Sequence, residues 1–377
     1  MHPVARLPEE WSAALAAQGE RAFRALQVFR WIHAKGELDP ARMSDLPPAL
    51  RASLATGGLA PVLSVADVRR ATDGTRKVLF RLHDGLTIES VLIPSVSGPG
   101  SAASDDADAA AAEDDDDAAL PERVRVTQCI STQVGCAMGC VFCASGVAGL
   151  KRNLGPEEIV AQVLAGRAAL EPGEELRNVV LMGMGEPLHN YDATARALRL
   201  LVHGQGVGLS TRRVTVSTSG LVPEIERLGR DFGGQIGLAV SLHAADDETR
   251  TRLMPINRKY PLGDLLEALR AYPLPARRRI TIEYTLVAGS NDDVAGAKRL
   301  ARVLRGIPVK INLIPMNPID ASTLGPPASG GVEAFQRVLL DAGYSCFVRR
   351  RRGDDVSAAC GQLALLGAKP RVRVDRS

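Results

Sequence analysis

Three cysteines stand close together in the segment GCAMGCVFCASG, at Cys136, Cys140 and Cys143, with the spacing C-x3-C-x2-C. Thiolates that share one loop in this way can bind three irons of a [4Fe-4S] cluster and leave the fourth iron open to a small molecule. A structural zinc ion would need a fourth protein ligand nearby, and disulfides are rare in cytoplasmic chains. The spacing therefore favours an open iron–sulfur cluster over a zinc site or a disulfide pair.

The elements that must position this loop follow from the pattern after Arg123, where apolar, strand-like segments alternate with helix-like segments as far as SCFVRRR. Repeated strand–helix units predict an α/β fold, with parallel strands in a barrel or open barrel and functional residues at the carboxyl ends of the strands. Several of these predicted ends carry unusual residues: Gly185-Glu186-Pro187, Ser217-Thr218-Ser219-Gly220, Ser241-Leu242-His243 and Asn312.

Two smaller regions precede the barrel pattern. Residues 1–62 are predicted to form a small helical module of an RNA-binding type, because apolar residues from Phe23 to Ile32 mark one helical face with basic residues between them. Residues 63–94 alternate apolar and polar side chains around Asp-Gly turn signals, which predicts a β-meander linker. The expected division then continues with an acidic insertion at 95–121, a core barrel at 122–348 and a basic C-terminal segment at 349–377.

The acidic insertion contains almost no large apolar residue and holds eight acidic residues, so it cannot bury enough surface to fold. We expect a disordered loop without a catalytic role. The whole chain has a net charge of +3, but without this segment 46 basic residues face 35 acidic ones, a balance of +11. A body that basic suits a polyanionic partner, with nucleic acid first in line.

Composition excludes several other classes of protein. With 377 residues, 45% of them apolar and 24% charged, the chain is large enough for one large domain with a smaller companion. This composition excludes both general disorder and a small disulfide-stapled fold. No stretch approaches the ~18 uncharged apolar residues of a membrane span. The start, MHPVARLPEEW, lacks the basic-then-apolar order of a secretory signal. We therefore expect a cytoplasmic protein.

Beyond the cysteine loop, the sequence resembles the radical S-adenosylmethionine enzymes and, among them, the adenine-C2 RNA methyltransferases of the RlmN family. The resemblance runs from the N-terminal helices to Leu363, apart from the acidic insertion. It implies a partial (β/α)6 radical-SAM barrel with a small N-terminal helical domain and a short β-meander. The segments that carry it are, in order, VGCAMGCVFCASG, NVVLMGMGEPLHNY, RRVTVSTSGLVP, AVSLHAADDETR, PINRKY, ITIEY, KINLIPMNP and RGDDVSAACGQL.

The resemblance also implies the cofactors and their ligands. A [4Fe-4S] cluster would be bound by the three cysteines of the loop, and two molecules of S-adenosylmethionine would be used in each turnover. The carboxylate of Glu186 suits the ammonium group of that ligand, while Ser217 and Asn312 can form hydrogen bonds with its polar groups. The full set of implied S-adenosylmethionine-binding residues is Gly185, Glu186, Ser217, Ser241, Leu242, His243 and Asn312.

Three further residues receive catalytic roles from the resemblance. Cys360 would accept a methyl group from the first S-adenosylmethionine, Glu89 would take the C2 proton of the adenine, and Cys129 would resolve the covalent protein–RNA adduct by forming a disulfide with Cys360. Taken alone, Glu89 would be interpreted as a solvated strand residue and the two cysteines as buried thiols. Whether Cys129 and Cys360 are bonded at rest stays open.

Adenine chemistry supports the need for such equipment. C2 lies between two ring nitrogens and is electron-poor, so it will not displace a methyl group from a sulfonium ion by ordinary nucleophilic attack. A radical route is required, and the cofactor supplies it. Because C2 is hidden in a stacked helix, the target adenine must be unpaired or drawn out of the stack.

The implied substrates are an adenine in the peptidyl-transferase region of 23S rRNA and the adenine beside the anticodon in certain tRNAs, and an electron donor such as flavodoxin is expected. Because one chain supplies the catalytic set, we expect a monomer. The runs Arg349–Arg352, Arg277–Arg279 and Arg212-Arg213 are candidate phosphate contacts. Two alternatives remain. One is the related C8-methylating resistance enzyme, although Pro187 and the STSG segment resemble the C2 enzymes more closely; the residues alone leave the choice between C2 and C8 open. The other is a non-catalytic RNA-binding protein with a structural iron–sulfur or zinc site.

Overall fold

One continuous sheet forms the body of the molecule. The computed structural model describes residues 1–95, 123–319, 322–328, 330–349, 351–359 and 361–363. Its ten-stranded sheet has the order β1-β2-β3-β4-β7-β8-β9-β10-β11-β12. Neighbouring strands are antiparallel from β1 to β4 and parallel from β4 to β12. β4 is therefore the strand at which the sheet changes direction.

The strands are β1 (Leu63–Arg70), β2 (Arg76–Leu82), β3 (Thr87–Pro94), β4 (Val124–Cys129), β7 (Glu174–Leu181), β8 (Val214–Thr218), β9 (Gly237–Ser241), β10 (Ile280–Leu286), β11 (Val309–Pro315) and β12 (Cys346–Val348). A separate small sheet pairs β5 (Gln133–Val134) with β6 (Arg152–Asn153). The helices are α1 (Pro8–Ala16), α2 (Phe23–His33), α3 (Pro48–Thr56), α4 (Ala144–Ala148), α5 (Pro156–Ala168), α6 (Tyr191–Val202), α7 (Val222–Phe232), α8 (Asp247–Leu253), α9 (Leu262–Ala271), α10 (Val294–Val303) and α11 (Gly331–Asp341).

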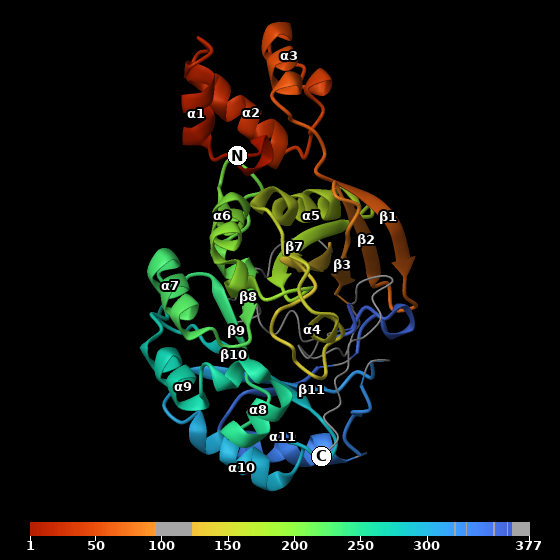
Figure 1. Cartoon of the computed structure of the whole chain (residues 1–377), viewed down its shortest axis with the longest axis vertical. Helices are drawn as coiled ribbons and strands as arrows, with labels where there is room; N and C mark the ends of the chain where they lie inside the picture. The colour runs from red at the N-terminus through yellow and green to blue at the C-terminus, as the bar shows by residue number, and fades with distance from the viewer. Residues whose placement is uncertain (96–122, 320–321, 329, 350, 360, 364–377) are drawn as a thin grey trace.

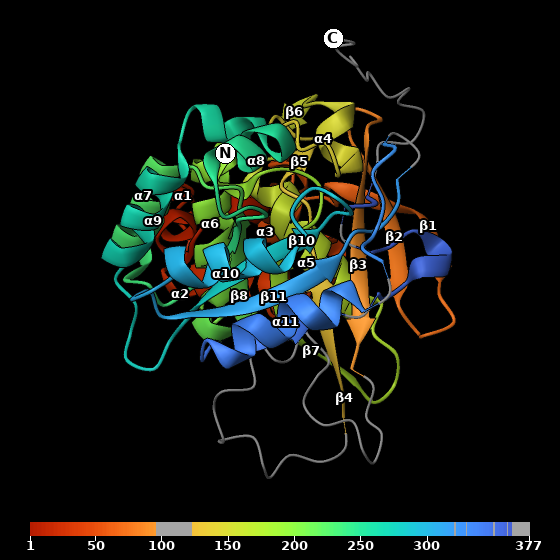
Figure 2. The same ribbon diagram turned by 90° about the horizontal axis from the view of Figure 1, so that it is seen from below.

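Helices cover the outer side of the parallel strands (Figures 1 and 2). Every residue of the central strand β10 is buried, its polar residues Thr281, Glu283 and Thr285 included, as expected for a parallel strand covered on both faces. The N-terminal helices rest on α5 and α6 (Figure 1), where Arg196 forms two hydrogen bonds with Glu10 of α1. The predicted α/β fold with a helical N-terminal region and antiparallel N-terminal strands is confirmed.

Apart from Ser95, the predicted acidic insertion lies outside the described residues, but the strands on either side of it are described. Ser95 follows β3, Arg125 belongs to β4, and the two residues are joined by hydrogen bonds from Ser95 N to Arg125 O (2.7 Å) and from Arg125 N to Ser95 Oγ (3.1 Å). Because β4 begins here, the insertion leaves and re-enters the fold at the amino ends of the parallel strands. The described helices include none that is long and apolar enough to cross a membrane.

A buried guanidinium group fixes the opposite, carboxyl ends of two strands. Arg250 of α8 has no exposed surface. Its Nη2 donates to the carbonyl oxygens of Ser219 (2.7 Å) and Ser241 (3.3 Å), just beyond β8 and at the end of β9, and its Nε donates to Leu242 O (3.1 Å). Its Nη1 donates to the Asn257 side chain (2.8 Å), which belongs to the PINRKY segment. Burial lowers the pKa of Arg250 to about 10, so the group remains charged at neutral pH.

Replacing Arg250 by Met should lower the free energy of unfolding by roughly 3 kcal/mol, because buried carbonyl groups lose their donor. Urea unfolding followed by circular dichroism measures this change. The matched control is Arg302→Met, an exposed position in α10 where the change should stay within about 0.5 kcal/mol. An Arg250→Met protein as stable as the wild type would contradict the assignment.

Candidate active site and its cluster-binding loop

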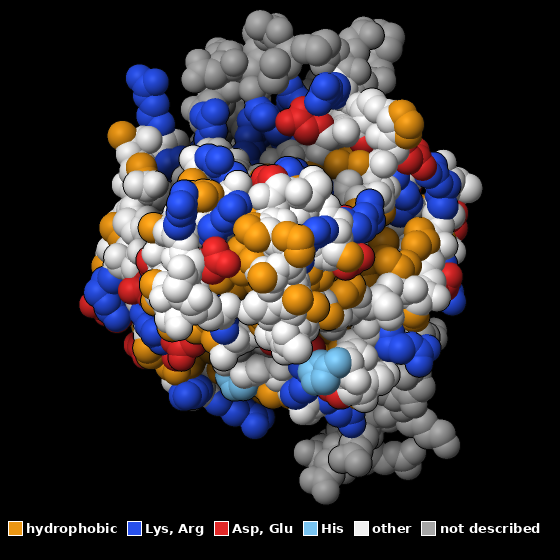
Figure 3. Space-filling model, turned by 90° about the horizontal axis from the view of Figure 1, so that it is seen from above, with side chains coloured by type: hydrophobic (Ala, Val, Ile, Leu, Met, Phe, Trp, Pro, Cys, Tyr) orange, Lys and Arg blue, Asp and Glu red, His pale blue; other side chains and the backbone are white. Residues whose placement is uncertain are grey.

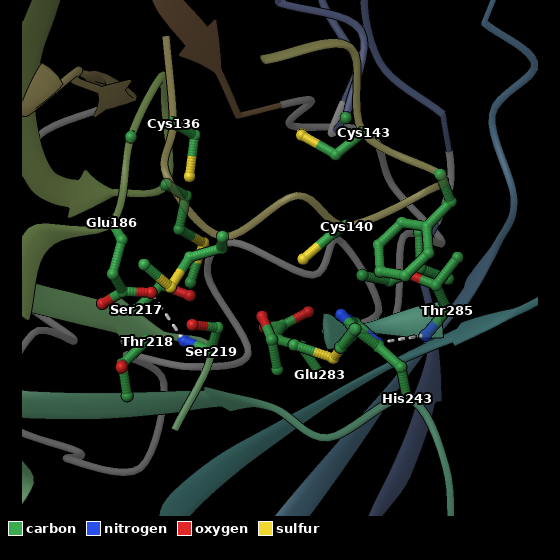
Figure 4. A pocket seen from close by; sticks show the side chains of 18 of the residues that line it. Cys136, Cys140, Cys143, Glu186, Ser217, Thr218, Ser219, His243, Glu283 and Thr285 are labelled. Carbon is green, nitrogen blue, oxygen red and sulfur yellow. Dashed lines mark hydrogen bonds between the residues drawn. The ribbon is translucent and has the colours of Figure 1, made fainter. Parts of the chain in front are cut away.

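The three cysteines line one pocket at the carboxyl ends of the parallel strands (Figure 4). They lie in the loop between β5 and α4, and Cys143 caps α4. Glycines hold this loop tightly folded. At Gly135 (φ +78°) a Cβ atom would lie 1.9 Å from the carbonyl oxygen of Gly149, and at Gly146 it would lie 2.9 Å from Cys140 N. A side chain at either place would displace the cysteines.

The chemistry of the loop fits a cluster. Burial raises the pKa of Cys136 to about 12, and burial with the neighbouring thiols raises the pKa of Cys140 well above its ordinary value. Thiolates in this place therefore need a nearby positive charge, which iron ions supply. Three thiolates in one loop match the three protein ligands of an open [4Fe-4S] cluster, in which each thiolate binds its own iron, whereas a structural zinc ion takes four protein ligands.

Glu186 lies across the pocket from the loop (Figure 4), on the turn after β7. Its carboxylate accepts hydrogen bonds from Ser219 N (2.7 Å) and Leu188 N (3.1 Å). Gly185 before it has φ +104° and presses on Gln133, where a Cβ atom would come within 2.6 Å of the Gln133 side chain. Burial raises the pKa of Glu186. The site thus holds a carboxylate in a fixed orientation, and a bound ammonium group would stabilise its charge.

His243 is held in one protonation state at the end of β9. Its φ of 56° is rare for a residue other than glycine, and its carbonyl oxygen accepts from Asn291 Nδ2 (2.7 Å). Its Nδ1 accepts from Thr285 N (2.8 Å), and its ring packs edge-on against Phe142 of the cysteine loop at 4.8 Å. Burial lowers the pKa of His243 to about 3. The ring is therefore neutral, with the proton on Nε2, where it can donate to a ligand.

The structure places some of the other predicted ligand residues in the pocket wall and others away from it. Ser217 and Ser241 line the pocket together with Gly185, Glu186 and His243. Leu242 and Asn312 do not line it: Leu242 is fully buried, and Asn312 donates from Nδ2 to Glu283 Oε1 (3.1 Å).

Glu283 is a pocket residue that the sequence analysis missed. It is 4% exposed, lies in β10 between Ser241 and Asn312 in the register of the sheet, and faces the pocket (Figure 4). Burial raises its pKa, and Arg349 Nη1 lies 3.9 Å from its Oε2. The signal that could have found it is the one charged residue in the middle of the strand ITIEYTL, whose other residues are apolar or threonine. Further pocket residues that were not predicted as ligands are Thr218, Ser219, Thr285 and Asn317.

Glu89 and Cys129 lie on the adjoining strands β3 and β4 and are 5% and 7% exposed. Val91 pairs with Cys129, so Glu89, two residues before Val91, shares the face of the sheet on which Cys129 lies. Gln128, the neighbour of Cys129, points the other way, because its Nε2 donates to the Gln162 carbonyl oxygen of the outer helix α5 (2.7 Å). Glu89 and Cys129 therefore both face the interior, away from α5.

Cys360 lies outside the described residues, but the chain after it is placed. Gly361 lines the pocket, and its carbonyl oxygen accepts a hydrogen bond from Ala144 N (2.8 Å). Ser145 Oγ donates to Leu363 O (2.6 Å). Both donors follow the cluster cysteines directly, so the segment after Cys360 is bound to the cluster loop.

The arginine run before Cys360 has contacts inside the protein. Besides the approach of Arg349 to Glu283, Arg351 Nη2 donates to the Met316 carbonyl oxygen (3.1 Å) and Arg352 contacts Asp73 and the carbonyl oxygen of Pro94. Residue 350 lies outside the described part of the chain. The three described arginines therefore attach the C-terminal segment to the sheet, and their predicted role as phosphate contacts gains no support from these positions.

Comparisons with known proteins agree with this site. Residues 130–301 match the Radical SAM superfamily, and residues 8–57 match the ribosomal RNA large subunit methyltransferase N-terminal domain. A Sorangium cellulosum (strain So ce56) protein named "Dual-specificity RNA methyltransferase RlmN" is 76% identical over 380 residues, which cover 99% of this chain and 98% of that protein. A Geobacter sulfurreducens protein of the same name is 47% identical, over 94% of this chain and 89% of its own length.

A solved structure agrees as well. The crystal structure of a radical SAM methyltransferase from Sphaerobacter thermophilus superposes with a TM-score of 0.84 at 44% identity, over 96% of this chain and 99% of that one. The superfamily match includes the cysteine loop and the strands from β7 to β10, and it implies a [4Fe-4S] cluster and S-adenosylmethionine. On its sequence, its fold and its cysteine pocket, the chain belongs to the RlmN family of radical SAM RNA methyltransferases.

Proposed function

We propose that this protein methylates C2 of an adenine in the peptidyl-transferase region of 23S rRNA and of the adenine beside the anticodon in tRNAs. The observation that carries the proposal is one pocket in which the cluster cysteines, Glu186 and His243 meet the residue that follows Cys360 in the chain. The near-complete match to relatives named dual-specificity RNA methyltransferases supports the choice of substrate.

The pocket residues bind and orient S-adenosylmethionine. Glu186 accepts the ammonium group, since its carboxylate is fixed and buried without a cation of its own in the described residues. Ser217 and Ser241 offer hydroxyl groups from two neighbouring strand ends, and neutral His243 offers the Nε2 proton. With the cluster bound by the three cysteines, the pair of cofactors supplies a one-electron cleavage that yields a 5′-deoxyadenosyl radical.

The protein's own sulfur and carboxylate groups carry the rest of the reaction. Cys360 would take the methyl group of a first S-adenosylmethionine. That S-methyl group would lose a hydrogen atom to the 5′-deoxyadenosyl radical from a second S-adenosylmethionine, which leaves as 5′-deoxyadenosine, and its carbon would bond to C2 of the adenine, with the surplus electron returned to the cluster. Glu89 would take the C2 proton. The thiolate of Cys129 would then attack the sulfur of Cys360, so that a disulfide forms, the carbon–sulfur bond breaks and the released carbon takes a proton as the methyl group of the RNA. The shared face of Glu89 and Cys129 supports these roles, because both must reach the same adduct.

The RNA must present an unpaired adenine to this pocket. Lys and Arg side chains are spread over the face that carries the N-terminal helices, with acidic side chains between them and apolar side chains near its middle (Figure 3). This face shows no single basic stripe, so shape and unpaired bases are expected to matter beside phosphate contacts. The enzyme acts as a monomer, because one chain supplies the catalytic set, and it receives electrons from a donor such as flavodoxin.

An anaerobic turnover tests the proposal. The enzyme with reconstituted cluster, reductant and S-adenosylmethionine should convert an unmodified 23S rRNA fragment to a product that yields 2-methyladenosine on digestion and mass spectrometry. Cys136→Ala should abolish the product because the cluster loses a ligand. An 8-methyladenosine product would refute the C2 assignment, and deoxyadenosine release without methylation would refute the RNA substrate.

The methyl carrier is tested by Cys360→Ala. This protein should still bind iron and S-adenosylmethionine, yet methylate RNA at less than about 0.1% of the wild-type rate, because no other group accepts the methyl. Mass spectrometry of the wild-type peptide should show a methyl group on Cys360. Methylation at the wild-type rate by Cys360→Ala would remove Cys360 from this role.

The resolving thiol is tested by Cys129→Ala. Without a second thiol the reaction should stop after the carbon–carbon bond forms, so a covalent protein–RNA adduct should accumulate under turnover conditions. Denaturing gel electrophoresis with labelled RNA detects the adduct. If Cys129→Ala turns over freely and no adduct is trapped, another group resolves it.

A further inference from the structure

The antiparallel strands hold the segment that leads to Cys360. Residues 352–358 pack against the turn between β1 and β2. Gly353 N donates to Asp73 Oδ2 (3.0 Å), and Thr72 N donates to Asp355 Oδ2 (3.0 Å). Gly353 has φ +66°, and a Cβ atom there would come within 2.9 Å of the Thr75 side chain. This close approach gives the C-terminal segment a defined position on the β-meander.

Lys77 of β2 joins this segment to the proposed base. Its Nζ lies 3.1 Å from Glu89 Oε1 and donates to the carbonyl oxygen of Ser357 (3.2 Å). Lys77 is 8% exposed and Glu89 5% exposed. Ser357 has φ 52°, a left-handed conformation that needs support from its surroundings in a residue with a side chain. One ammonium group thus binds the carboxylate and fixes a strained carbonyl three residues before Cys360.

The register of the sheet places Lys77 next to residues that have proposed catalytic roles. Lys77 pairs with Val91, and Val91 pairs with Cys129, so these three residues form one row across β2, β3 and β4. Directly paired residues share a face, and Glu89 is on the same face two residues along β3. Lys77 therefore lies beside β3, the strand that carries the proposed base Glu89, and in the same row as Cys129, the proposed resolving cysteine.

A structural ion pair alone would not require this arrangement. Buried ion pairs can often be replaced by apolar side chains without loss of stability, so they are weak grounds for a purely structural role. An ammonium group has three donors and can hold more than one acceptor at once. Here its acceptors are the carboxylate that must meet the adenine and the backbone that leads to the methyl-carrying thiol.

We propose that Lys77 is a positioning residue of the methylation reaction. It holds the carboxylate of Glu89 and residues 353–359, which lead to Cys360, in fixed positions relative to each other. This inference rests on the proposed function of Glu89 and Cys360. Without Lys77, S-adenosylmethionine should still be cleaved, but fewer cleavage events should lead to methylation of the adenine. We call this ratio of methylation to cleavage the coupling.

The test uses the holoenzyme with Lys77→Met, Lys77→Arg and, as a matched control, Lys298→Met at an exposed lysine of α10. Hydrogen exchange of the amides in residues 353–359 should be about tenfold faster in Lys77→Met than in the wild type, with α9 unchanged. In a single turnover, RNA methylation should fall about 10- to 100-fold while deoxyadenosine is still released, since small displacements of reacting groups have effects of this size. Lys77→Arg should restore a large part of the coupling, and Lys298→Met should behave as the wild type.

A general loss of fold is distinguished from lost positioning by Lys77→Ala with added methylammonium, which should recover methylation because it returns the missing charge and donors. The proposal is overturned if Lys77→Met shows wild-type exchange at 353–359 and wild-type coupling, or if neither arginine nor methylammonium restores any methylation. If the wild type itself methylates no RNA, the proposed function fails, and the exchange measurement alone then decides whether Lys77 holds the segment.

Discussion

The buried guanidinium group of Arg250 is the interaction on which the rest of the site depends. It binds the carbonyl oxygens at the ends of β8 and β9 in a place that water does not reach. The amide of Ser219 can therefore point at Glu186, and the chain after Ser241 can turn into the left-handed conformation of His243. The backbone beneath the predicted ligand residues is thus fixed from the inside, and hydrogen bonds to the side chains of Glu186 and His243 orient those side chains in turn.

The same burial decides the electrostatics of the pocket. Glu186, Glu283, Cys136 and Cys140 all have raised pKa values because they are removed from water. Because solvent does not stabilise the negative charges of these groups, the site is suited to positively charged occupants. Iron ions at the thiolates and an ammonium group at Glu186 are such occupants. Binding and deprotonation are thus coupled, and metal removal should weaken the ligand site as well as the loop.

Much of the architecture could be predicted from the sequence, and the reasons are physical. Strand–helix alternation shows a parallel sheet, and the carboxyl ends of parallel strands meet at one rim, which brought Glu186, Ser217 and His243 to the cysteine loop. Register could not be predicted in this way. Asn312 was expected at a strand end, but β11 continues to Pro315, so Asn312 lies in mid-strand opposite Glu283, where its amide donates to that carboxylate and does not line the pocket.

Contacts between distant residues escaped prediction for a different reason. Arg250 acts on backbone carbonyl groups, and Lys77 acts on a carbonyl 280 residues away, so neither has a local pattern that identifies it. The arginine run from Arg349 shows another limit of local patterns. A cluster of charges usually marks a solvated or nucleic-acid-binding face, but the described arginines of this run also contact Glu283, Met316 and Pro94 within the protein, so the run by itself does not identify a phosphate-binding face.

The change of direction at β4 explains how one sheet can serve two kinds of chemistry. On its parallel side, strand ends and their loops surround the cysteine pocket, as expected for a barrel that binds its ligand at the carboxyl rim. On its antiparallel side, side chains from the middle of β2 and β3 face the same interior, and the C-terminal segment crosses over them. Cys129 ends the strand common to both sides. Cys129 therefore lies where the two halves of the sheet meet, next to Val91 of β3 and Val180 of β7 in the register of the sheet.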